Sequence, residues 1–144
     1  MLQETFQTER SAGRSLQAAE FEHVRISRGC HFVVVAIKAR SLLNPDRFRR
    51  IMRRLGIRFE QFIFLDFGSG KGRTLLLASQ FPFKRITGVG GAEELHRVAQ
   101  QNIRSYRGPR LRTRVESFQG DARAFALPPE PALLFFLTRS RKRS

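Results

Sequence analysis

Cysteine is almost absent from this sequence, since Cys30 is the only one among 144 residues. A single thiol excludes an internal disulfide and any metal site built from several cysteines. Proteins of the reducing cell interior commonly use cysteine this sparingly, so we expect a cytoplasmic protein. His23 and His31 also lack the spacing of a metal-binding pair, and no metal site is predicted.

Long apolar runs are missing as well. The longest, at residues 32–37, is far shorter than the roughly 20 residues that cross a bilayer. The N-terminus does not start with the basic and then apolar segment of a secretion signal. The chain is nevertheless 41% hydrophobic and 27% charged, which is typical of a folded domain. We therefore expect a single globular domain with no membrane partner.

Acidic residues are scarce, with 12 against 27 basic ones and a formal net charge of +15. Such an excess is typical of proteins that bind nucleic acids. The only lysines are Lys38, Lys71, Lys84 and Lys142, so arginine dominates the basic set. An arginine-heavy composition also follows from genome base composition alone. Both interpretations of the charge stay open.

The clearest helix signal lies at residues 44–56. Asn44 is a suitable N-cap, Pro45 fits the first helical position, and Gly56 is placed to end the helix. Apolar residues recur at helical spacing on one side, at Phe48, Ile51, Met52 and Leu55. Arginines cover the other side, at Arg47, Arg49, Arg50, Arg53 and Arg54. We favour the solvated outer face of a packed helix over an RNA-contacting face.

From residue 61 onward, apolar runs and helical patterns alternate. Strands are predicted at 61–67, 84–89, 112–119 and 132–137, and helices at 73–81 and 92–106. This alternation predicts an α/β fold, in which a parallel sheet is flanked by helices on right-handed crossovers.

The region before residue 44 is less regular. Residues 1–29 are polar and mixed, and we expect a loose arm with a short helix around residues 16–21. Residues 31–39 form either a strand or a buried helical turn. The predicted organisation is thus a partly ordered arm at 1–43, a ligand-binding domain at 44–137 and a basic tail at 138–144.

The stretch "FLDFGSGKGRT", residues 64–74, follows the first strand of the alternating region and is rich in glycine. A P-loop requires a glycine where Leu65 stands and a hydroxyl where Gly72 stands, which argues against that site. A dinucleotide loop requires a third glycine where Arg73 stands and an acid after the second strand, and both are missing. Neither phosphate-binding pattern fits.

The pattern that fits is an acid followed by alternate glycines, at Asp66, Gly68, Gly70 and Gly72. Glycines let the backbone approach a ligand closely. A carboxylate at the strand end suits a cation better than a phosphate. The loop therefore favours a ligand that carries an amino-acid ammonium group.

Four segments in order carry a family resemblance: "FIFLDFGSGKGRTLLLAS", "RITGV", "EELHRVAQQNI" and "GDA". Together they resemble the class I S-adenosylmethionine-dependent methyltransferases, including the Dot1-like group, over about residues 62–137. The resemblance implies a Rossmann-like fold, S-adenosyl-L-methionine as cofactor and transfer of its methyl group. It also implies that the methionine part lies over Asp66, Gly68, Ser69 and Gly70. Asp121 would accept a hydrogen bond from the adenine amino group, with the Ala122 backbone beside it; a turn aspartate is the structural alternative.

The sequence departs from this family at two places. Where the second strand ordinarily ends in an acid that holds the ribose, Gly90 stands, and we expect affinity to be about ten- to a hundred-fold lower. Glu93 or Glu94 on the next helix could substitute in part. The family also places a substrate-side motif and three more strands after the fourth strand, where this sequence reaches Ser144. We therefore expect a sheet truncated after about the fourth strand, as from a shifted reading frame or a premature stop, whose last strand is an unpaired edge.

Three functions remain open. The first is a methyltransferase, weakened or inactive, whose acceptor is a protein, an RNA or a small molecule. No catalytic side chain is predicted, because methyl transfer depends mainly on the proximity and orientation of the acceptor; His96 is expected to be a surface histidine. The second is a basic nucleic-acid-binding module that uses the arginine face and the tail. The third is a non-functional gene fragment.

Overall fold

The computed structural model describes residues 2–7, 23–39, 43–110 and 113–139. Its strands are β1 (Leu2–Gln7), β2 (His23–Arg28), β3 (Phe32–Ala39), β4 (Ile63–Phe67), β5 (Arg85–Gly90), β6 (Val115–Gln119) and β7 (Ala132–Arg139). The helices are α1 (Pro45–Arg54), α2 (Arg73–Ala78) and α3 (Glu93–Ser105), with short 3-10 turns η1 (Phe59–Gln61) and η2 (Ala122–Ala124).

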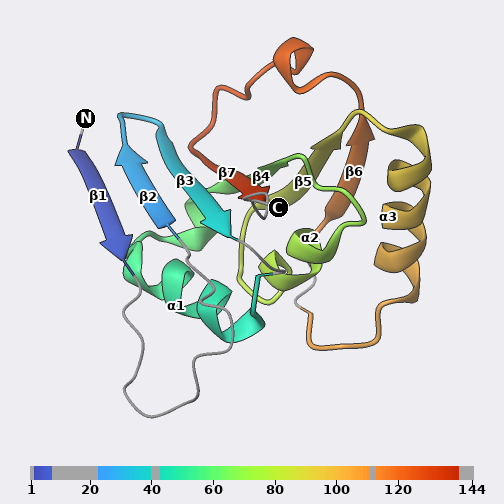
Figure 1. Cartoon of the computed structure of the whole chain (residues 1–144), viewed down its shortest axis with the longest axis horizontal. Coiled ribbons are helices and arrows are strands. Elements are labelled where there is room, and N and C mark those ends of the chain that lie inside the picture. Colours follow the sequence, from blue (N-terminus) through green and yellow to red (C-terminus); the bar gives the residue numbers. More distant parts are fainter. Residues whose placement is uncertain (1, 8–22, 40–42, 111–112, 140–144) are drawn as a thin grey trace, which may run out of the picture.

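All seven strands form one sheet in the order β1-β2-β3-β7-β4-β5-β6 (Figure 1). The five strands from β3 to β6 in this order run parallel, whereas β2 is antiparallel to both β1 and β3. The predicted α/β fold, with a mainly parallel sheet and flanking helices, is confirmed.

The N-terminal region corrects one prediction. A loose arm is wrong for β1 and β2, which are strands of the sheet, and β3 settles the open choice at residues 31–39 in favour of a strand. In β2, buried Val24 and Ile26 alternate with exposed His23 and Arg25. This alternation is too short to reveal a strand within a segment that is mostly polar. The short helix expected around residues 16–21 lies outside the described residues.

The position of β7 corrects a second prediction. This strand is not an unpaired edge, because it lies between β3 and β4 and is parallel to both. In register, Leu134 stands opposite Val34 on one side and Leu65 on the other. The three N-terminal strands occupy the side of β7 where the resemblance placed three later strands. The prediction was wrong because it took the region before residue 44 as an arm outside the sheet, whereas β3 of that region pairs with β7.

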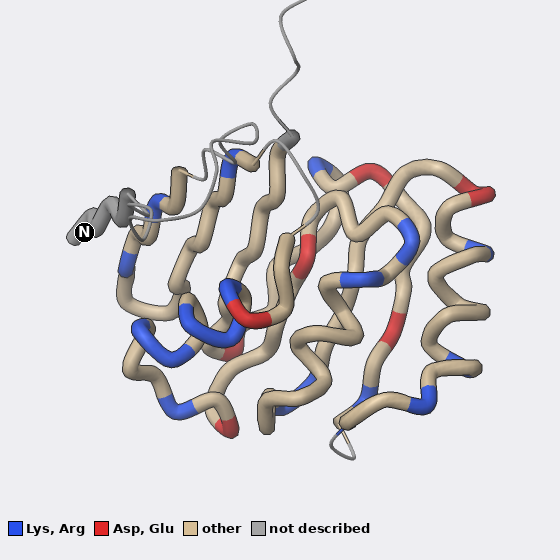
Figure 2. Tube along the Cα trace, turned by 60° about the horizontal axis from the view of Figure 1, so that its bottom comes forward, with Lys and Arg blue, Asp and Glu red and all other residues tan. Residues whose placement is uncertain are grey.

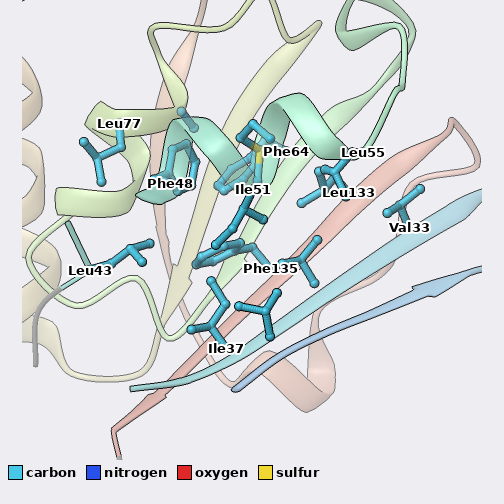
Figure 3. Close-up of a cluster of buried hydrophobic side chains, with 14 of the residues drawn as sticks. Val33, Ile37, Leu43, Phe48, Ile51, Leu55, Phe64, Leu77, Leu133 and Phe135 are labelled. Carbon is cyan, nitrogen blue, oxygen red and sulfur yellow. The ribbon is translucent and has the colours of Figure 1, made fainter. Parts of the chain in front are cut away.

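Helix α1 begins and packs as predicted. The Asn44 side chain accepts a hydrogen bond of 2.8 Å from the Asp46 backbone N–H, which satisfies one of the free donors of the first turn. The buried Phe48 contacts Phe64 and Phe135 edge to face, with ring centroids 6.1 and 5.7 Å apart. Figure 3 shows this aromatic group at the centre of the core between α1 and the sheet.

None of the helices in the described part of the chain has the length and apolar composition that a membrane span requires.

Candidate functional site

The carboxyl ends of β4, β5 and β6 meet at one edge of the sheet. Because the three strands are parallel neighbours, the loops that follow them leave from the same side. Backbone hydrogen bonds hold these loops together: the Gly68 N–H donates to the Val89 carbonyl at 2.8 Å, and the Gly120 N–H donates to the Gly90 carbonyl at 2.9 Å. The glycine loop and the "GDA" segment are thereby brought to the same place.

The glycine loop adopts backbone conformations that require glycine. Gly68, Gly70 and Gly72 have φ of 84°, 53° and 84°, in the left-handed region that L side chains rarely adopt. A Cβ at Gly72 would also stand 3.2 Å from the Cβ of Ala99 in α3, so the loop packs closely on that helix. At Gly68 and Gly70, in contrast, no atom lies within 4 Å of such a Cβ. The backbone is open to a ligand at those two positions.

Two adjoining cavities lie above these strand ends. The larger, of about 540 Å³, is lined by Gly68, Gly90, Asp121 and Ala122 together with other residues of the three loops. The smaller, of about 270 Å³, is lined by Gly68, Ser69, Gly70 and Gly90 and by residues of α3 and β6. The structure thus brings together every predicted site residue except Asp66, which lines neither cavity.

Asp66 lies beneath the loop, inside the protein. Its side chain is 2% exposed, and it stands in register with Gly88 and Phe135 on the neighbouring strands. Burial raises its pKa from 3.8 to about 7, and none of the described residues forms a hydrogen bond with it that would offset the loss of hydration. A cation bound over the loop would favour the ionised form of this carboxyl group.

Asp121 caps the short turn η2. Its Oδ1 accepts a hydrogen bond of 2.9 Å from the Arg123 backbone N–H, and its Oδ2 lies 3.0 Å from the Arg123 guanidinium. These bonds from Arg123, the side-chain bond first, lower the pKa of the Asp121 carboxyl. Both partners are well exposed, so the ion pair is weak and a ligand can compete with it. The turn role and a ligand-binding role are compatible.

Gly90 has room for a side chain. Its φ is outside the left-handed region, and a Cβ there would make an ordinary contact of 3.6 Å with the Ser69 hydroxyl oxygen. Sterics therefore leave space for the Cβ of an acid at this position. Glu93 and Glu94, considered above as substitutes, are exposed on the first turn of α3 and line neither cavity.

His96 and Ser117 also line the candidate site, and the sequence did not reveal them. The His96 Nδ1 lies 2.9 Å from the Ser117 hydroxyl oxygen, and both residues line the smaller cavity. His96, expected to be a surface histidine, is half-buried on the side of α3 that packs on β6. No motif signals a contact between residues 21 positions apart, because it depends on the packing of a helix on an edge strand.

Among the described residues, no group of three or more His, Cys, Asp and Glu side chains is arranged to hold a metal ion.

A parallel sheet with a glycine loop after β4 and an acid after β6 defines a Rossmann-like fold. Comparison with solved structures identifies it further. The glycopeptide N-methyltransferase MtfA, complexed with sinefungin, matches with a TM-score of 0.52 at 18% identity, over 66% of this chain and 37% of that one. This match shows that the chain has the Rossmann-like methyltransferase fold, in part.

Two other solved structures are similar over a shorter part of the chain. YcgJ from Bacillus subtilis is 22% identical over 59% of this chain and 34% of its own, with a TM-score of 0.45. StiE O-MT, residues 942–1257, is 27% identical over 58% of this chain and 29% of its own, with a TM-score of 0.44. The chain thus spans about a third of the length of the structures it matches. No family model and no curated protein sequence matches it.

Proposed function

We propose that this chain binds S-adenosyl-L-methionine at the carboxyl edge of the sheet and contributes the cofactor-binding part of a methyltransferase. The observation that carries the proposal is the convergence of Gly68, Gly90 and Asp121, which lie at or just after the ends of three neighbouring strands, around one cavity of about 540 Å³. That volume lies within the usual range of small-molecule sites.

The residues present suit the parts of this cofactor. The open backbone at Gly68 and Gly70 admits the methionine moiety close to the loop. Asp66 beneath the loop attracts the ammonium group through a poorly hydrated interior when it is ionised, and its pKa of about 7 allows the bound cation to favour that form. Asp121 provides carboxylate oxygens for the adenine amino group, in competition with Arg123.

When bound, S-adenosylmethionine supplies a methyl group on a sulfonium centre, which the nucleophile of an acceptor can attack. The part of this chain is to hold the cofactor in one orientation, which is the main protein contribution to such a reaction. The acceptor is a protein, an RNA or a small molecule.

Calorimetric titration with S-adenosylmethionine tests the proposal, with sinefungin, the ligand of the MtfA complex, as a second probe. We expect saturable binding to the folded wild-type chain. The absence of heat at millimolar ligand, in a sample whose fold circular dichroism verifies, would leave the fold without the function.

A pair of glycine variants separates loss of the site from loss of the fold. Gly70 and Gly56 both have positive φ, 53° and 61°, and both have open space around a Cβ. Gly70→Ala and Gly56→Ala therefore introduce similar backbone strain, of about 1–2 kcal/mol. We expect only Gly70→Ala to weaken binding; equal effects of both substitutions would contradict a ligand at the loop.

A second candidate function is binding of a nucleic acid through the arginine face of α1. Arg50, Arg53 and Arg58 are exposed, and basic positions group along α1 at the lower left of Figure 2. In part this face is structural, since Arg49 pairs with Asp46 at 2.8 Å and also donates a hydrogen bond to Gln80. RNA binding that weakens steeply with salt, and further in Arg50→Gln/Arg53→Gln, would support this function. RNA binding that does not depend on salt, or no RNA binding, would contradict this second function.

A further inference from the structure

We infer that His96, held by Ser117, is a ligand-binding residue that contacts the ribose hydroxyls of the cofactor in place of the acid that Gly90 lacks. The inference rests on the proposed function, because it concerns the same ligand. It assigns a role to the smaller cavity, which neither Asp66 nor Asp121 lines.

The polar side chains around the smaller cavity are few. Ser69, His96 and Ser117 supply them, while the rest of the lining is glycine, Ala92 and Leu95. Gly90 lies on the wall of both cavities, so a ribose that bridges them would pass this position. Any hydrogen bond from a side chain to that ribose in the smaller cavity must therefore come from one of these three residues.

A contact at one ring nitrogen holds the orientation of the His96 side chain. Its Nδ1 lies 2.9 Å from the Ser117 hydroxyl oxygen, which leaves Nε2 as the ring nitrogen available to a ligand. Ser117 stands in register with Gly88 of β5, on the sheet face that carries α3. With either tautomer, Nε2 can form a hydrogen bond to a hydroxyl group, because a hydroxyl both donates and accepts.

The Ser69 hydroxyl is a second polar group in the smaller cavity that a ligand can reach. Ser69 is 8% exposed and lines the same cavity, and its side chain forms no hydrogen bond with any of the described residues. A Cβ at Gly88 would stand 2.7 Å from this oxygen, so the hydroxyl occupies space that any larger residue at Gly88 would take. The hydroxyl is therefore free to bond with water or with a polar group of a bound molecule.

A neutral imidazole and a serine hydroxyl form weaker bonds than a carboxylate does. Each such bond is worth roughly two- to tenfold in affinity. His96 thus restores part of the binding lost at Gly90.

The test pairs the variant His96→Ala with a change in the ligand. We would titrate wild type and variant with S-adenosylhomocysteine and with its counterpart that lacks both ribose hydroxyls. Wild type should lose about tenfold in affinity when the hydroxyls are removed, whereas His96→Ala should lose about threefold or less. His96→Gln, which keeps a donor and an acceptor, should lie between them. His31→Ala, at an exposed histidine between β2 and β3, should behave as wild type.

The comparison is a ratio of affinities within each variant, so a change in stability shared by both titrations cancels. The same ratio in His96→Ala and wild type would overturn the inference and leave the proposed function intact. No binding of either ligand by folded wild type would overturn both. Ser117→Ala removes the hydrogen bond to the His96 ring but leaves the ring in place. The loss of affinity on removal of the ribose hydroxyls should therefore lie between the values for wild type and His96→Ala.

Discussion

Gly90 at the end of β5 faces Ser69 of the glycine loop, with 3.6 Å between a Cβ built on the glycine and the serine hydroxyl oxygen. A Cβ therefore fits at this position without a shift of its neighbours. We predict that Gly90→Glu raises the affinity for S-adenosylmethionine about tenfold or more, because a carboxylate can accept hydrogen bonds from both ribose hydroxyls.

Calorimetry on Gly90→Glu and Gly91→Glu checks this prediction. A Cβ at Gly91 has no atom within 4 Å, so the control adds the same charge one residue further along. An equal gain in both variants would mean that the added charge attracts the cationic ligand without a specific contact. An unchanged affinity of Gly90→Glu would place the ribose elsewhere.

The buried Asp66 predicts a dependence of stability on pH. Its folded pKa of about 7 lies above the unfolded value of 3.8, so the folded state keeps a proton that the unfolded state releases. The stabilisation of the folded state by this proton is fully present below about pH 4 and is lost as the pH rises to about 7. The free energy of unfolding changes by about 4 kcal/mol over this range, because each pKa unit corresponds to about 1.36 kcal/mol.

Urea unfolding of wild type and Asp66→Asn between pH 4 and 8 measures this effect. Wild type should lose stability relative to the variant as the pH rises, because asparagine does not titrate. Parallel curves for the two proteins would mean that Asp66 is hydrated or paired in solution.

A close approach within the site predicts that Gly88 tolerates no side chain. A Cβ there would stand 2.7 Å from both Ser69 and Leu75, too close for any real contact. Gly88→Ala should destabilise the protein by about 1–3 kcal/mol through overpacking. Gly91→Ala, with open space around its Cβ, is the matched control, and thermal unfolding of the pair should separate them. Equal melting temperatures of Gly88→Ala and Gly91→Ala would show that Ser69 and Leu75 can shift at little cost in free energy.

The N-terminal strands predict that their buried residues contribute to stability. Ile26 of β2 is fully buried, whereas its neighbour Arg25 is exposed. We expect Ile26→Ala to reduce the free energy of unfolding by about 2–5 kcal/mol and Arg25→Ala to change it by less than about 0.5 kcal/mol. Denaturant titration checks both values. A neutral Ile26→Ala would return the N-terminal region to the loose arm that its sequence suggests.

Features encoded within one short segment could be predicted from the sequence. The cap at Asn44 and the apolar spacing from Phe48 to Leu55 defined α1, and the glycines after Asp66 placed the loop. Features that depend on distant partners could not be predicted. The insertion of β7 between β3 and β4 and the contact of His96 with Ser117 leave no local pattern, since each joins segments that meet only in the folded sheet.

The place of β7 in the sheet also bears on how the chain is made. Phe32 of β3 pairs with Ala132 of β7, so one hydrogen-bonded flank of β3 has no partner until residues 132–139 have left the ribosome. Until then β3 and β4 each present an open, apolar strand edge, the kind of surface on which nascent chains aggregate. We therefore expect the sheet to fold more slowly than one built only from neighbouring segments, because β7 must insert between two strands that precede it in the chain.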